Sequence, residues 1–165
     1  MKVIDNFLSS YHLNQLHLVV MGDRFPWFYN QTTTTFGVQC PRYTHMIYRD
    51  PSISPTSKYF SLFDVFSSKL KVKKLYRIMI NSMLPSFLVS KNTGFHIDRF
   101  PCSQTAIYYL NTNNGYTKFK GYGKVKCVEN RMVIFDSKLQ HAAFTSTESR
   151  RITVNFNYEG GVSLG

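Results

Sequence analysis

The residues of this sequence best suited to chemistry are two histidines and one aspartate from two distant segments. Residues 94–100 read Gly-Phe-His-Ile-Asp-Arg-Phe and predict a β-strand. Side chains two residues apart on a strand point to the same face, so His96 and Asp98 project side by side. An imidazole and a carboxylate placed in this way can serve as two ligands of a metal ion. His141, far along the chain, is the candidate for the third ligand.

A second pattern follows about ten residues after the last histidine. Residues 151–156 read Arg-Ile-Thr-Val-Asn-Phe and predict another strand, with Arg151 and Thr153 on one face. A planar guanidinium can hold a carboxylate with two parallel hydrogen bonds, so Arg151 is suited to bind an anion in a protein interior. Two histidines and one carboxylate on one side of a metal form the facial triad typical of non-haem Fe(II) oxygenases.

The ordered set of these patterns resembles the Fe(II)/2-oxoglutarate-dependent oxygenase family. Residues 106–111, Ala-Ile-Tyr-Tyr-Leu-Asn, look like its prolyl-4-hydroxylase-like branch, in particular a small member of phage or microbial type. The resemblance extends from about residue 74 to residue 158 and is weaker before that. Members of the family often have Gly-Gly after the turn that follows the Tyr-Tyr strand, whereas this sequence has Gly115 and Tyr116.

The resemblance implies a mainly β fold, the double-stranded β-helix, also called a jelly roll and similar to cupins. Many aromatic and β-branched residues agree with a β protein. About eight short predicted strands separated by turn residues fit this fold. We expect one dioxygenase domain over residues 1–165, with two or so supporting N-terminal helices in about residues 1–72 and a jelly-roll core in about residues 74–158.

The resemblance also implies the cofactors. Fe(II) is expected at His96, Asp98 and His141, with 2-oxoglutarate as cosubstrate, O2 as oxidant and ascorbate as a candidate reductant. The far carboxylate of 2-oxoglutarate is expected to bind the guanidinium of Arg151 and the hydroxyl groups of Thr153 and Tyr109. The amide of Asn81 is a further candidate. If Arg151 does not bind this carboxylate, the next candidates are Arg150, Arg77 and Arg131.

Three hypotheses for the function remain open. The first is hydroxylation of a protein, a peptide or a free amino acid, as in the prolyl-hydroxylase branch, coupled to conversion of 2-oxoglutarate to succinate and CO2. The second is oxidation of nucleic acid, as in AlkB-type demethylases. The third is a non-catalytic jelly-roll binding protein. The net charge of +11 favours polyanionic partners but also fits a basic, soluble surface without such a role.

The supporting elements can be placed from their periodicity. Apolar residues at helical spacing predict one helix from Ser9 or Ser10 to Gly22 and another over residues 60–71. Residues 2–4 and 75–84 predict strands. Residues 36–59 contain three prolines and several serines, which predicts irregular structure. This segment is a candidate lid or substrate-recognition arm, and an ordered surface loop is the alternative.

Targeting signals are missing from the part of the sequence where they would be expected. The first residues lack the apolar run of a signal peptide, and no stretch approaches the ~18 apolar residues of a membrane span. Three widely spaced cysteines without Cys-x-x-Cys spacing predict reduced thiols. We therefore expect a cytoplasmic protein without a membrane partner, or one in the host cytoplasm if a phage encodes it.

Overall fold

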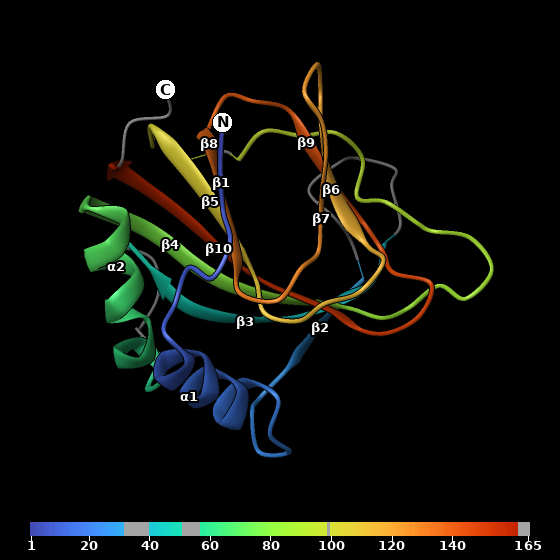
Figure 1. Ribbon diagram of the computed structural model, residues 1–165, viewed down its shortest axis with the longest axis horizontal. Helices are drawn as coiled ribbons and strands as arrows, with labels where there is room; N and C mark the ends of the chain where they lie inside the picture. The colour runs from blue at the N-terminus through green and yellow to red at the C-terminus, as the bar shows by residue number, and fades with distance from the viewer. Residues whose placement is uncertain (32–39, 51–56, 99, 162–165) are drawn as a thin grey trace.

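Two antiparallel sheets face each other and enclose the protein interior (Figure 1). The computed structural model describes residues 1–31, 40–50, 57–98 and 100–161. The larger sheet contains, in spatial order, β1 (Lys2–Ile4), β8 (Arg131–Asp136), β5 (Gln104–Tyr109), β10 (Arg151–Gly160), β4 (Val72–Met83), β3 (Arg42–Arg49) and β2 (Phe28–Asn30). The smaller sheet contains β7 (Gly123–Lys126), β6 (Tyr116–Phe119) and β9 (His141–Phe144). This architecture confirms the predicted mainly β, jelly-roll fold.

The strict alternation of β10 separates two environments. Ile152 and Val154 are buried on the outer face of the larger sheet, where they join the main hydrophobic core. Arg151 and Thr153 face the other way, toward the smaller sheet, and line a cavity there. A second apolar cluster closes the other part of the space between the sheets, and it includes Ile107, Tyr109, Phe119, Val125, Cys127, Val133 and Phe135. Several buried polar residues are thus brought together in this cavity between the two sheets.

The predicted supporting helices are confirmed. The α-helix α1 (Ser10–Val20), the 3-10 helix η1 (Phe60–Phe63) and the α-helix α2 (Asp64–Leu70) lie on one side of the larger sheet, opposite the smaller sheet (Figure 1). Their apolar residues, among them Leu16, Val20, Phe66 and Leu70, belong to the main core. Within the described residues, no helix combines the length and the apolar character needed to cross a bilayer.

The prediction of irregular structure over residues 36–59 is wrong for its middle part. Arg42–Arg49 forms β3, which pairs with both β2 and β4. Its sequence, Arg-Tyr-Thr-His-Met-Ile-Tyr-Arg, alternates well enough for a strand, but the neighbouring prolines suggested a loop. Pro41 stands just before the strand and therefore removes no hydrogen bond from its ladder. The rest of the expected lid, residues 36–39 and 51–56, lies outside the described residues.

The prediction of a regular strand over residues 94–100 is also wrong. Only His96 pairs with another strand, through an isolated antiparallel bridge to His141. Gly94 adopts a left-handed φ of 71°, and Pro101 has no backbone N–H to donate, so a longer ladder is interrupted at both ends. The segment is nevertheless extended enough at its centre to bring its two metal-ligand candidates into the interior. Arg99 lies outside the described residues.

Phe66 offers a direct test of how the helical layer supports the sheet. Its ring is fully buried and its centroid lies 4.8 Å from that of Phe156 and 4.9 Å from that of Tyr108. We expect Phe66→Ala to lower the free energy of unfolding by about 3–5 kcal/mol, because it leaves a cavity in the core. Urea unfolding measures this, with Tyr11→Ala on the exposed face of α1 as the control. Equal small losses in both variants would contradict this role of α2.

Candidate metal centre

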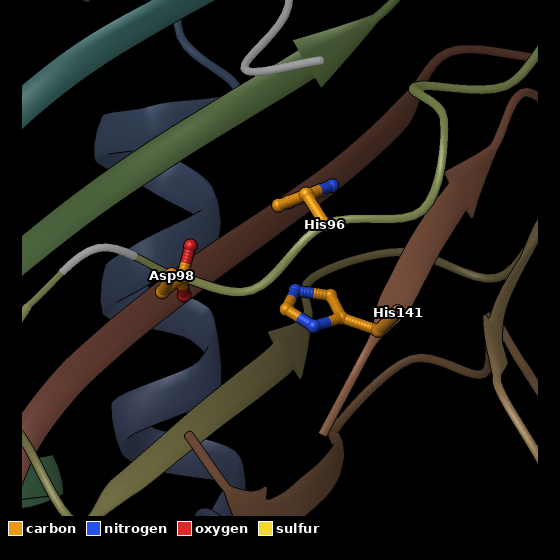
Figure 2. A group of neighbouring side chains, drawn as sticks. All are labelled: His96, Asp98 and His141. Carbon is orange, nitrogen blue, oxygen red and sulfur yellow. The ribbon is translucent and has the colours of Figure 1, made fainter. Parts of the chain in front are cut away.

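The three predicted metal-ligand candidates come together in the interior. His96, Asp98 and His141 each present one ligand atom, and these atoms all lie within 4.8 Å of one another. His96 and Asp98 lie on the segment that follows β4, and His141 is the first residue of β9 (Figure 2). Two imidazoles and one carboxylate in this arrangement match the donor set that non-haem Fe(II) prefers.

The two histidines are held next to each other by their own backbones. The His96 N–H donates to the His141 carbonyl oxygen at 3.0 Å, and the His141 N–H donates to the His96 carbonyl oxygen at 3.0 Å. Their ring centroids are 4.6 Å apart. Such a directly opposed pair places both side chains on the same face of the chain pairing.

The Nδ1 atoms of both histidine rings lie within hydrogen-bond distance of backbone carbonyl oxygens. His96 Nδ1 lies 3.0 Å from the carbonyl oxygen of Gly94, and His141 Nδ1 lies 3.1 Å from that of Leu139. A carbonyl oxygen only accepts, so in each ring the proton belongs on Nδ1. The Nε2 lone pair is then free for a metal, and the carbonyls fix the orientation of the rings.

Asp98 is held by two strands of the larger sheet. Arg77 Nη2 donates to Asp98 Oδ1 at 3.2 Å, and Asn157 Nδ2 donates to Asp98 Oδ2 at 2.8 Å. Arg77 Nε also donates to Asn157 Oδ1 at 2.8 Å, so the three side chains form a closed network. Burial favours the neutral acid, but the charge of Arg77 and the hydrogen bond from Asn157 oppose it, and the pKa of Asp98 lies below its usual value.

The protonation states favour metal binding. Burial lowers the pKa of His141, although the Asp98 carboxylate opposes this shift. His141 is therefore neutral at neutral pH while Asp98 is ionised. These are the forms in which imidazole and carboxylate bind a metal.

The cluster opens into a cavity between the two sheets. The space here amounts to about 500 Å³ when the open solvent at the mouth of the cavity is included. Besides the metal-ligand candidates, its lining includes three arginines, Arg42, Arg77 and Arg151. The other polar residues that line it are Asn81, Thr93, Thr117, Thr153 and Asn155.

Arg151 is a buried cation without an anionic partner. Its side chain is 2% exposed. Its Nε donates to Cys127 Sγ at 3.2 Å, and its Nη2 donates to Thr117 Oγ1 at 2.9 Å. All nine Asp and Glu residues belong to the described residues, and none of the ion pairs formed there includes Arg151. A thiol is a weak acceptor, so the guanidinium retains capacity for an anion.

The other residues predicted to bind the cosubstrate lie near Arg151. Two of them line the cavity, and one lies behind its wall. Thr153 and Asn81 line the cavity directly. Tyr109 is fully buried and does not line it, but its hydroxyl donates to Thr117 Oγ1 at 2.8 Å and its ring lies under the Arg151 guanidinium, 5.7 Å from Cζ. Thr117 is therefore a hydroxyl that lines the cavity and bonds to both Arg151 and Tyr109. Sequence reasoning missed it, although its inward position on a strand of alternating pattern was readable.

The alternative arginines have other partners. Arg77 binds Asp98, Arg131 binds Asp5 at the surface with an Nε–Oδ1 distance of 2.6 Å, and Arg150 stacks over Trp27 at 5.9 Å. Sequence reasoning also missed Arg42, because residues 36–59 were not expected to contain a strand. It missed Asn157 too, since nothing near Asn157 in the sequence indicates that it contacts Asp98.

The fold is shared with several solved structures. A 2OG-Fe(II) oxygenase family oxidoreductase from Burkholderia pseudomallei aligns with a TM-score of 0.70 and 15% identity, over 94% of this chain and 83% of that one. A prolyl hydroxylase from Trichoplax adhaerens, in complex with a hypoxia inducible factor peptide fragment, aligns at 0.62 and 18% identity, over 95% and 82%. A prolyl-4-hydroxylase from Pseudomonas putida aligns at 0.59 and 16% identity, over 97% and 92%.

These similarities are structural. No protein-family model matches the sequence, and no curated protein matches it. The chain therefore shares the fold of these 2-oxoglutarate/Fe(II) oxygenases and prolyl hydroxylases. At 15–18% sequence identity, the similarity establishes the fold alone.

Asn157 allows a test of the network around the centre. Asn157→Ala removes the donor to Asp98 Oδ2 and leaves all three metal-ligand candidates in place. We expect the affinity for Mn(II) to fall by about 10–100-fold, as is usual for partners that orient a ligand. Calorimetry measures this, with Asn114→Ala, whose bonds lie in a surface turn, as the control. An unchanged Mn(II) affinity in Asn157→Ala would argue against Asp98 as a metal ligand.

Proposed function

We propose that this protein is an Fe(II)- and 2-oxoglutarate-dependent dioxygenase that hydroxylates a protein, a peptide or an amino acid. One observation carries the proposal. A His-Asp-His cluster and a buried arginine without an anionic partner lie in the same cavity, inside a fold that known 2-oxoglutarate oxygenases share.

The metal is assigned to His96, Asp98 and His141. Bound Fe(II) supplies the activation of O2 that is coupled to oxidative decarboxylation of 2-oxoglutarate to succinate and CO2, with ascorbate as an external reductant. The protein's contribution is geometric and electrostatic. The backbone pairing fixes the two imidazoles, and the Arg77 and Asn157 side chains keep the Asp98 carboxylate ionised and oriented.

The cosubstrate is assigned to the end of the cavity around Arg151. Arg151, Thr117 and Thr153 present a guanidinium and two hydroxyls to the cavity there. Tyr109 supports them from behind by holding Thr117. A carboxylate at this position neutralises a buried charge that would otherwise be costly.

The substrate class rests on the neighbours and on the cavity. Two structural neighbours are named as prolyl hydroxylases, and one of these is in complex with a peptide fragment. A peptide or amino-acid substrate agrees with a cavity that is open at one side and polar within. The structure itself does not select a prolyl group.

Nucleic-acid oxidation is the second candidate, and one surface feature favours it. Lys118 of β6 lies directly opposite Lys124 of β7, and Lys126 follows on the same exposed side of the smaller sheet. Like charges placed opposite each other are unfavourable unless an anion lies between them. Salt-sensitive binding of a single-stranded oligonucleotide, lost in Lys118→Glu, would favour this candidate.

Succinate release is the direct test of the proposed reaction. The purified protein is supplied with Fe(II), 2-oxoglutarate and ascorbate, with and without amino acids, peptides and oligonucleotides. We expect succinate to form and one substrate class to stimulate its formation. A protein that binds metal but forms no succinate under any of these conditions would instead be a binding protein with this fold.

Arg151 is the residue on which the cosubstrate assignment depends. Arg151→Lys keeps the positive charge but loses the bidentate hydrogen bonding of the guanidinium. We therefore expect 2-oxoglutarate binding to weaken by about 1–3 kcal/mol. Arg151→Ala should weaken it further while leaving metal affinity nearly intact. Calorimetry with Mn(II) and without O2 measures both, and Arg150→Gln is the matched control because Arg150 stacks on Trp27. An unchanged dissociation constant in Arg151→Ala would move the cosubstrate elsewhere.

A further inference from the structure

We propose that Arg42 binds a carboxylate of the substrate, at a second anion position in the same cavity as the cosubstrate. The proposal rests on the proposed function and narrows its substrate class. It assigns a role to the one cavity arginine that neither the metal centre nor 2-oxoglutarate uses.

Arg42 enters the cavity from a strand that the other site residues do not share. It is the first residue of β3 and lines the cavity with Arg77 and Arg151. The register of β3 and β4, with Tyr43 opposite Ser82, sets Arg42 level with Met83. Met83 in turn lies opposite Arg151 in β10. Arg42 and Arg151 therefore begin two strands apart, about 10 Å at the backbone.

One donor of the Arg42 side chain lacks a partner within the described residues. Arg42 Nε is buried, and no described group bonds to it. No ion pair among the described residues includes Arg42, and all nine acidic residues lie in that part of the chain. Buried donors are nearly always paired, so an unpaired one in a residue that lines a cavity indicates a group that arrives from outside.

The charges of the cavity leave an excess of cations. Among the described residues, three arginines line it, whereas Asp98 is the only acidic residue in the lining. Asp98 is paired with Arg77. In the proposed complex, one 2-oxoglutarate carboxylate binds the metal and the other binds Arg151. Arg42 then remains as a half-buried cation without an anionic partner among the described residues, which another anion would neutralise.

The charged groups around Arg42 come from both ends of the cavity. Burial lowers its pKa, Arg77 adds to this shift, and Cys40 and Asp98 oppose it. Arg77 and Asp98 belong to the metal end, whereas the strand register sets Arg42 level with Arg151. An anion on Arg42 would therefore lie in the cavity that the metal-ligand candidates and Arg151 share, on a strand of its own.

The chemistry of the position favours a carboxylate over a phosphate. A single guanidinium matches the two oxygens of one carboxylate. A phosphate carries more negative charge than a carboxylate, and the described part of the lining contains no lysine that would supply a further cation beside Arg42. The substrate class is thus a compound or residue that carries a carboxylate, as an amino acid does.

Acetate is the probe for this site. The protein is loaded with Mn(II) and saturating 2-oxoglutarate, and the broadening of the acetate methyl proton signal by the paramagnetic ion is titrated. We expect saturable broadening in the unchanged protein and a loss of acetate affinity by about tenfold or more in Arg42→Gln. Arg150→Gln should retain the acetate affinity. Inorganic phosphate is titrated in parallel, and a melting curve checks that each variant is folded.

The outcomes separate this inference from the proposed function. If 2-oxoglutarate does not bind to the Mn(II)-loaded protein, the proposed function fails. If 2-oxoglutarate binds but acetate broadening survives Arg42→Gln, or acetate only displaces 2-oxoglutarate, the second anion position is overturned alone. Arg42-dependent binding of phosphate without acetate overturns the carboxylate class.

Discussion

The interior ion pair between Asp98 and Arg77 is the interaction on which the candidate site depends. Taking two charges out of water is costly, and the pair is tolerable because Asn157 bonds to both partners at once. Arg77 comes from β4 and Asn157 from β10, so two central strands hold the segment that carries two of the three metal-ligand candidates. That segment has almost no regular pairing of its own. Its position is set by this network and by the backbone pair of His96 and His141.

The distribution of charge inside the barrel connects the site to its ligands. A folded chain that buries arginines without acids stores an unfavourable energy that an anionic ligand can relieve. Arg151 is buried and Arg42 is half-buried, at different places in one cavity. The proposed dicarboxylate cosubstrate and carboxylate-bearing substrate would supply the anions that these two cations lack.

Much of the fold and of the His-Asp-His cluster could be predicted from the patterns in the sequence. Alternation along residues 151–156 correctly assigned Arg151 to the interior, and the ligand types and their order indicated the His-Asp-His cluster. Contacts across the barrel were not predictable in this way, because Asn157 and Thr117 are ordinary strand residues until the sheets are assembled. The error at Arg42–Arg49 arose because nearby prolines were given more weight than alternation.

The central claim is that His96, Asp98 and His141 hold one divalent metal. Calorimetric titration of the metal-free protein with Mn(II), alongside His141→Ala, tests it most directly. The account predicts one ion per chain in the unchanged protein and loss of that binding in His141→Ala, with the same cooperative melting in both. Retention of one tightly bound Mn(II) in His141→Ala would contradict the account, because it would show that the metal lies elsewhere.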